Sequence, residues 1–109
     1  MAYDTQLGER IREKLKSTRG LVEKKMFGGV GFMIHGNMAC GILKNDLIVR
    51  INPENHNEMM KRPHVKPFDN MSRPMAGWIL VTPEGCKTDK ALADWVKMGL
   101  DFAKSLPPK

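Results

Sequence analysis

Three short apolar runs lie close together in the first half of the chain, at about Met26–Ile34, Met38–Leu43 and Leu47–Ile51. Turn-forming clusters separate them at residues 36–37 and 44–46. Apolar runs of this length joined by short turns are typical of hairpins, so the pattern predicts a three-stranded antiparallel meander. Both alternating sets of positions are apolar, and we therefore expect helices or another subunit to cover most of the second face of the sheet.

A fourth strand is expected at Met75–Thr82, where β-branched and aromatic residues are concentrated. The preceding segment, Arg62–Arg73, contains two prolines and no clear periodicity, which predicts a loop of about 12 residues. Loops of this length in a small domain often carry function. This loop is therefore the first candidate for a functional site.

Three helices are predicted around this sheet. The first spans about residues 5–18 and has apolar residues spaced by four. A short one spans Pro53–Lys61, with proline at its start. The last spans about residues 89–105 and has a wide apolar face that must be buried. The predicted fold class is α+β, with an antiparallel sheet of about four strands packed with N- and C-terminal helices and a short middle helix.

The composition is that of an ordinary globular protein, with 41% hydrophobic and 28% charged residues among 109. This length predicts a single domain over residues 1–109. No apolar run approaches the roughly 20 residues that a membrane-spanning helix needs, and the N-terminus has no pattern typical of a secretion signal. We therefore expect a cytoplasmic protein without membrane contact, in which Cys40 and Cys86 are reduced thiols.

None of the patterns that carry catalysis stands out. The glycine-rich run at residues 26–32 lacks the Lys-Ser/Thr pair of a phosphate-binding loop and precedes a strand. Its glycines rather indicate a bulge or a close approach of another backbone. His35, His56 and His64 have no metal-ligand spacing, and Cys40 lies in an apolar run, as a buried thiol would. We expect no catalytic residue, no metal and no cofactor.

A group of residues around the predicted loop and fourth strand is more suggestive: Arg50, His64, Asp69, Arg73 and Trp78. A charged strand residue beside an ordered loop can form a pocket for an anion or for a protein partner. The simpler alternative is structural, with Arg50 paired to Asp69 so that the loop is pinned to the sheet. The sequence leaves both alternatives open.

The chain is basic, with a formal net charge of +6, which permits binding to a polyanion without setting specificity. Cations are densest in the first helix and just after it. Arg12, Lys16 and Arg19 are the candidate nucleic-acid contacts. Glutamates interrupt this group, so it resembles a solvated helix face more closely than a nucleic-acid-binding arm.

Several motifs, in this order, resemble the TfoX (Sxy) N-terminal domain family. They are Met26-Phe27-Gly28-Gly29-Val30-Gly31-Phe32, Asn37-Met38-Ala39-Cys40-Gly41, Asp46–Arg50, Pro63-His64-Val65 with Pro67 and Asp69, Arg73-Pro74-Met75 with Gly77-Trp78, and Ser105-Leu106-Pro107-Pro108-Lys109. The resemblance covers nearly the whole chain. It implies a small α+β domain with an antiparallel sheet and helices at both ends, and no established catalytic residues.

The resemblance also implies a regulatory role. The name-giving members regulate natural DNA competence, act with a cyclic-AMP-responsive transcription activator at competence promoters, and carry a second, C-terminal domain. Together with the lack of catalytic patterns, this predicts a non-enzymatic interaction domain. It would be a transcriptional co-regulator that contacts a protein partner through its sheet edge and the predicted loop.

Two other functions stay open. One is direct nucleic-acid binding through the basic first helix, and the other is a small-molecule or enzymatic site around Arg50 and His64. The two-sided apolar sheet also suggests a twofold homodimer, although burial under the final helix accounts for the same residues.

Overall fold

The computed structural model describes residues 4–26, 29–70 and 73–107, except the side chains of residues 26, 69, 70 and 73–76. A first helix is followed by four strands, a short helical segment, two further strands and a last helix. The elements are, in order, α1 (Thr5–Leu15), β1 (Leu21–Met26), β2 (Gly29–Ile34), β3 (Asn37–Leu43), β4 (Asp46–Arg50), the 3₁₀ turn η1 (Pro53–Asn55), α2 (His56–Met59), β5 (Val65–Asn70), β6 (Arg73–Val81), the 3₁₀ turn η2 (Pro83–Cys86) and α3 (Asp89–Ser105).

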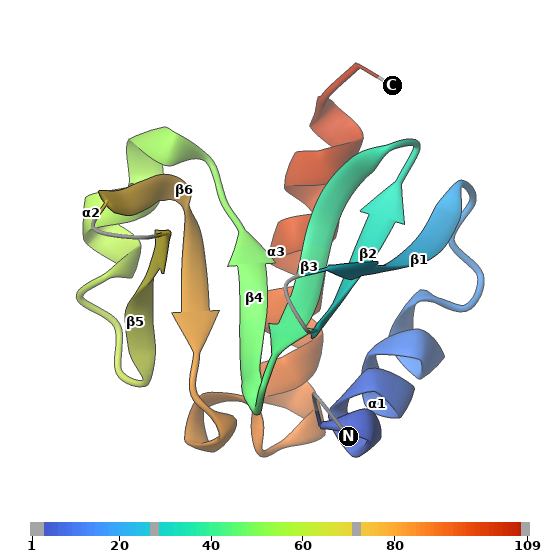
Figure 1. Cartoon of the computed structure of the whole chain (residues 1–109), viewed down its shortest axis with the longest axis horizontal. Helices are drawn as coiled ribbons and strands as arrows, with labels where there is room; N and C mark the ends of the chain where they lie inside the picture. The colour runs from blue at the N-terminus through green and yellow to red at the C-terminus, as the bar shows by residue number, and fades with distance from the viewer. Residues whose placement is uncertain (1–3, 27–28, 71–72, 108–109) are drawn as a thin grey trace.

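The six described strands form an antiparallel sheet in the order β1-β2-β3-β4-β6-β5 (Figure 1). The predicted meander is confirmed, because β2, β3 and β4 pair in chain order. The predicted fourth strand is confirmed as β6, which pairs with β4 from Leu47↔Val81 to Arg50↔Trp78. The α+β class is therefore correct, but the predicted number of strands, about four, is too small.

The prediction of a loop over residues 62–73 is wrong, because β5 occupies most of this segment. β5 pairs with β6 from Val65↔Val81 onward, and the ladder is irregular between Pro67 and Asp69. Proline cannot donate to a ladder and is confined to edge strands and bulges. β5 is an edge strand with a bulge at this point, so the proline that suggested a loop is compatible with a strand.

β1 is the other strand that the sequence pattern missed. Its sequence, LVEKKM, has three charged residues in a row, which hides the alternation of a half-buried strand. It pairs with β2 from Leu21↔Ile34 to Met26↔Gly29. Charges on an edge strand discourage pairing with another chain, so this composition suits the strand's place at the edge.

The three predicted helices are confirmed, with different ends. α1 begins after Asp4, whose Oδ1 accepts hydrogen bonds from the backbone N–H groups of Gln6 and Leu7 at 3.0 and 3.2 Å. It ends at Leu15, earlier than the predicted Thr18. The middle helix is one 3₁₀ turn, η1, followed by one α-helical turn, α2. In the described part of the chain no helix has the length and apolar character needed to cross a membrane.

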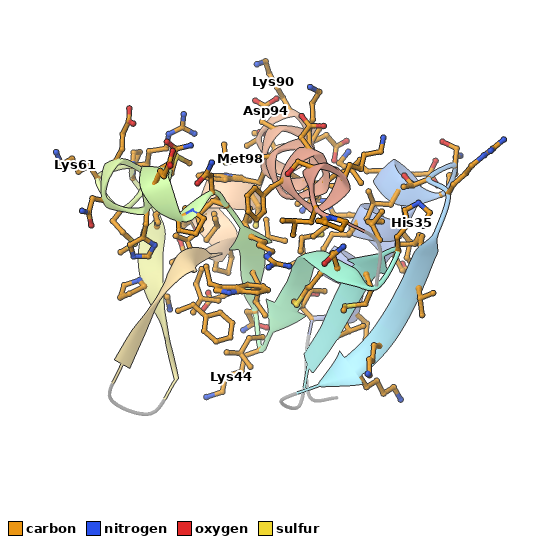
Figure 2. All side chains as sticks on the ribbon, turned by 90° about the horizontal axis from the view of Figure 1, so that it is seen from above. His35, Lys44, Lys61, Lys90, Asp94 and Met98 are labelled. Carbon is orange, nitrogen blue, oxygen red and sulfur yellow. The ribbon has the colours of Figure 1, made fainter. Side chains whose placement is uncertain are left out.

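All three helices lie on the same side of the sheet (Figure 2). Under them, side chains from α1, α3 and the four inner strands form the main core. Its members without exposed surface are Ile11, Leu15, Phe32, Cys40, Ile42, Leu47, Val49, Ile79, Val81 and Leu92. α3 approaches the sheet closely at Gly99, where a Cβ atom would overlap the carbonyl oxygen of Ala39. A larger residue at this position would push the helix away from β3.

Cys40 and Cys86 are both free thiols, as predicted, and both are buried, which the sequence predicted only for Cys40. Burial raises the pKa of the Cys40 thiol from 9.0 to about 12, and burial also raises the pKa of Cys86. The unfolded chain therefore loses the Cys40 proton at a lower pH than the folded chain does. Stability associated with this thiol is complete below pH 9 and falls as the pH rises toward 12.

We expect Cys40→Ala to weaken the alkaline loss of stability. The slope of the unfolding free energy against pH should become less negative above pH 9, by up to about 1.4 kcal/mol per pH unit. Urea unfolding at a series of pH values measures this slope independently of any constant cost of the substitution. An unchanged slope would show that the folded thiol ionises as readily as the unfolded one.

Candidate interaction surface

One face of the sheet carries no described helix. Figure 2 shows the helices above the sheet, while the outer strands bend downward, away from them. We call the helix-free side the open face. It is formed by a cluster of apolar side chains: Met33, Met38, Leu43, Ile48, Phe68, Trp78 and Leu80. No described helix covers the second face, so the expectation of a helical cover is not met there, and covering by another subunit stays a prediction.

The centre of the open face is shielded by its own side chains. Met38, Ile48 and Leu80 are buried, with exposed fractions of 7%, 2% and 8%. Around them lie half-buried residues that include Phe68 and Trp78, whose ring centroids are 6.3 Å apart at an interplanar angle of 58°. Tilted aromatic pairs of this kind stabilise one another beyond the area they bury. The side chains of the open face thus pack against one another and still present aromatic and thioether surface.

A β-bulge in β3 determines which of its side chains lie on each face of the sheet. Phe32 pairs with Cys40 but Met33 pairs with Met38, so Ala39 is an extra residue in β3. Such a bulge reverses the alternation on its far side. Cys40 consequently lies in the core under the helices, whereas Met38 packs on the open face.

Arg50, at the end of β4, lies between two aromatic rings. Its guanidinium carbon is 5.0 Å from the ring centroid of Trp78 in β6 and 5.5 Å from that of Phe102 in α3. Both distances are typical of cation–π contacts. Partial burial lowers the pKa of Arg50, but a guanidinium stays charged at neutral pH. Among the described carboxylates none forms an ion pair with Arg50.

The backbone just before Trp78 fixes the position of its ring. Gly77 has φ +88°, a conformation that side-chain-bearing residues rarely adopt. Its carbonyl oxygen accepts a hydrogen bond of 2.8 Å from the N–H of Ile51. A Cβ atom at Gly77 would also lie 3.1 Å from the Pro53 side chain. The glycine thus holds Trp78 opposite Arg50 in the strand register.

Phe102 also borders a groove on the helix side of the sheet. The groove has a volume of about 330 Å³ and is lined by Ile51, Asn52, Asn55, Met59, Met98, Asp101 and Phe102. The polar rim is partly engaged within the chain, because the Asn52 Oδ1 accepts from the Glu54 N–H and Asp101 pairs with Lys97. The groove is close to the lower limit of small-molecule sites, about 300 Å³.

The structure brings together two of the five predicted site residues, Arg50 and Trp78. His64 lies elsewhere, because its carbonyl oxygen accepts from the N–H of Thr82, four residues beyond Trp78 and so about 13 Å along β6. The side chains of Asp69 and Arg73 lie outside the described residues. The pairing of Arg50 with Asp69 therefore stays a prediction.

Sequence reasoning missed two aromatic members of the site, Phe68 and Phe102. Phe68 was hidden in the segment that resembled a loop. Phe102 lies three residues after Gly99, at the border of the apolar face of α3, and an aromatic residue at such a border is a signal that could have been used.

The basic residues of α1 are largely engaged with carboxylates of the same chain. Arg12 pairs with Glu23 at 2.7 Å and Lys16 with Glu13 at 2.7 Å. Arg19, beyond the helix, is exposed. The predicted nucleic-acid contacts thus do not form a set of free cations on one helix face.

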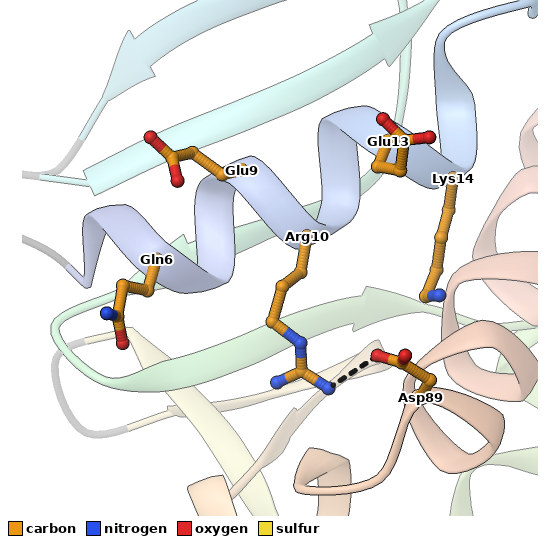
Figure 3. A pocket seen from close by; sticks show the side chains of 6 residues that line it. All are labelled: Gln6, Glu9, Arg10, Glu13, Lys14 and Asp89. Atoms are coloured by element: carbon orange, nitrogen blue, oxygen red, sulfur yellow. Dashed lines mark hydrogen bonds and ion pairs between the residues drawn. The ribbon is translucent and has the colours of Figure 1, made fainter.

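Another cation, Arg10, connects α1 to the start of α3. It pairs with Asp89 at 3.3 Å (Figure 3) and donates a hydrogen bond of 3.2 Å to the carbonyl oxygen of Lys87. The surrounding hollow of about 440 Å³ is lined by the charged or polar residues Gln6, Glu9, Arg10, Glu13, Lys14 and Asp89. Within the described residues, no three His, Cys, Asp or Glu side chains are grouped so that they could hold a metal ion.

We expect the basic end of α1 to bind DNA only weakly, because phosphate contacts by Arg12 and Lys16 must replace existing ion pairs. Fluorescence anisotropy with a labelled duplex at roughly 50 and 200 mM salt measures this. The dissociation constant should be no tighter than about 1 μM, the range of non-specific binding. Tighter, salt-sensitive binding that is lost on replacing Arg12, Lys16 and Arg19 by alanine would instead support direct nucleic-acid binding.

Comparison with known families agrees with the resemblance in the sequence. The sequence profile of the TfoX N-terminal domain matches residues 13–103. The chain belongs to this family. The matched part of this TfoX N-terminal domain contains all six described strands and also Arg50, Trp78 and Phe102. Searches of curated proteins and of solved structures gave no significant match.

Proposed function

We propose that this TfoX N-terminal domain is a non-enzymatic cytoplasmic interaction domain that binds a protein partner on the open face. One observation supports the proposal above others. Arg50 is partly buried between Trp78 and Phe102, yet no described carboxylate pairs with it. Tryptophan and arginine are the residues most enriched in the energetic centres of protein interfaces.

The two edges of the sheet are less suited to a partner than its face. β1 carries Glu23, Lys24 and Lys25, and β5 carries Lys66 and Pro67. Charges and proline on edge strands oppose the addition of a further strand. We therefore propose that the partner contacts the open face, and not the sheet edge and the loop that the sequence predicted as the contact.

The alternative of an enzymatic site has little support in the described side chains. Both thiols are buried with raised pKa values, whereas a nucleophilic cysteine needs a lowered pKa and access to solvent. His64 and Arg50, the centre of that alternative, lie on different parts of the sheet. The described residues thus offer an aromatic and cationic surface and no acid–base pair.

The family suggests which partner to test. Its name-giving members act with a cyclic-AMP-responsive transcription activator, so we propose an activator of this class as the partner and transcriptional co-regulation as the role. Isothermal titration calorimetry of the native chain with the purified activator and cyclic AMP measures the affinity. We expect saturable binding.

The variant Arg50→Met tests whether the open face makes the contact. Methionine keeps an apolar side chain between the two rings and removes the charge. Affinity should fall by about tenfold or more. Arg62→Met is the matched control, because Arg62 lies 5.5 Å from the ring of Trp95 on the helix side. It should change affinity by less than about twofold.

Two results would count against the proposal. If the native chain does not bind, an activator of this class is not the partner. If Arg50→Met binds as tightly as the native chain, the contact lies on another surface. Thermal unfolding of each variant establishes that it is folded at the temperature of the titration.

A further inference from the structure

We propose that the open face recognises an acidic segment of its partner, with Arg50 binding a carboxylate and the apolar cluster binding the side chains next to it. This inference rests on the proposed function. It adds the chemistry of the partner, which the family match does not give.

The charges on the open face are the first argument. Strand alternation and register direct Lys24, Arg50 and Lys66 to this side of the sheet. Their paired residues on the neighbouring strands, Gly31, Trp78 and Leu80, lie on the same side. The register likewise places Asp46 there. Asp46 is already paired with Lys66, at 2.8 Å.

Among the described residues, Lys24 on the open face and Arg50 at the border between this face and α3 consequently have no carboxylate partner. A partner that places acidic groups over them would be complementary in charge. A partner with a basic surface would be repelled.

The ring contacts of Arg50 are the second argument. A guanidinium in cation–π contact still has N–H groups with which it can donate hydrogen bonds. Those donors match the two oxygens of a carboxylate, which accepts two parallel hydrogen bonds. The contacts with the rings of Trp78 and Phe102 restrict the Arg50 side chain, so less side-chain entropy is lost on binding than for a free arginine.

Charge also argues against a second copy of this chain as the occupant. A twofold contact would bring together two surfaces that each carry Lys24 and Arg50 without a described carboxylate partner. The net charge of +6 on each copy adds to this repulsion. The apolar cluster is therefore better suited to an acidic partner than to self-association.

A displayed library of short random peptides tests the inference with the full chain. Peptides that bind the native chain more tightly than they bind Arg50→Met are selected, synthesised and titrated. We expect them to carry aspartate or glutamate beside apolar residues. Replacing that acid by its amide should weaken binding to the native chain about tenfold, and should leave binding to Arg50→Met unchanged. An effect of the acid-to-amide replacement that is present in the native chain and absent in Arg50→Met shows that the acid contacts Arg50.

The possible failures separate the inference from the proposed function. Selected peptides that lose binding in Trp78→Ala, but tolerate replacement of every acid, would overturn the acidic recognition and leave the interaction surface standing. Acidic peptides that require Arg12, Lys16 and Arg19 in place of Arg50 would overturn it as well. So would a dimer, seen by light scattering, that Trp78→Ala dissociates, or DNA binding lost in Arg50→Met. A library without any binder to the native chain would count against both.

Discussion

Gly99→Ala is expected to destabilise the fold by about 2 to 3 kcal/mol, the cost of overpacking a well-packed interior. Alanine is the better helix former, by about 1 kcal/mol, so helix propensity alone predicts the opposite sign. Packing decides, because the added methyl group would overlap the carbonyl oxygen of Ala39, a backbone atom that cannot rotate away. α3 would have to move off β3. Urea unfolding of the two proteins measures the difference.

The control for this substitution is Asp94→Ala, on the exposed side of the same helix (Figure 2). It removes a solvent-exposed pair with Lys90 and should change stability by less than about 0.5 kcal/mol. A Gly99→Ala protein as stable as the native one would show that α3 lies farther from β3 than described.

Trp78→Ala is expected to weaken partner binding by roughly 30-fold or more, which corresponds to about 2 kcal/mol, the lower limit for an interface hot spot. The substitution removes the ring that contacts both Arg50 and Phe68. The guanidinium then loses one of its two ring contacts, and the open face loses its largest side chain. Calorimetric titration of the activator measures the loss.

The matched control for Trp78 is conservative replacement by phenylalanine. Phenylalanine keeps an aromatic face over Arg50 and should retain most of the affinity, whereas a binding site elsewhere would respond to neither substitution. Trp78 belongs to the smaller cluster on the open face and not to the main core. The alanine variant should therefore remain folded, which its thermal unfolding curve will show.

The parts of the fold that the sequence predicted are those with strong local signals. Apolar runs separated by turns marked β2, β3 and β4, and the wide apolar face after Thr88 marked α3. In both cases local pattern and tertiary burial agree. β1 and β5 were not predicted because they are edge strands. Their charged residues and proline interrupt the apolar pattern that identifies inner strands.

The site was predicted only in part for a similar reason. Arg50 and Trp78 stood out as a charged and an aromatic residue within apolar strands, but their neighbours depend on tertiary structure. Phe102 reaches Arg50 only because α3 packs against β3 and β4. The grouping of His64 with Arg50 rested on the predicted loop. It is wrong because β5 pairs with β6 and places His64 away from Arg50.

NMR of methyl-labelled methionine during titration with the activator tests the central claim most directly, because methionines report on both sides of the sheet. Met33 and Met38 lie on the open face, whereas Met59 and Met98 line the groove on the helix side. Binding on the open face should shift or broaden the signals of Met33 and Met38 and leave the other two nearly unchanged. Changes confined to Met59 and Met98, with Met33 and Met38 unaffected, would contradict the account.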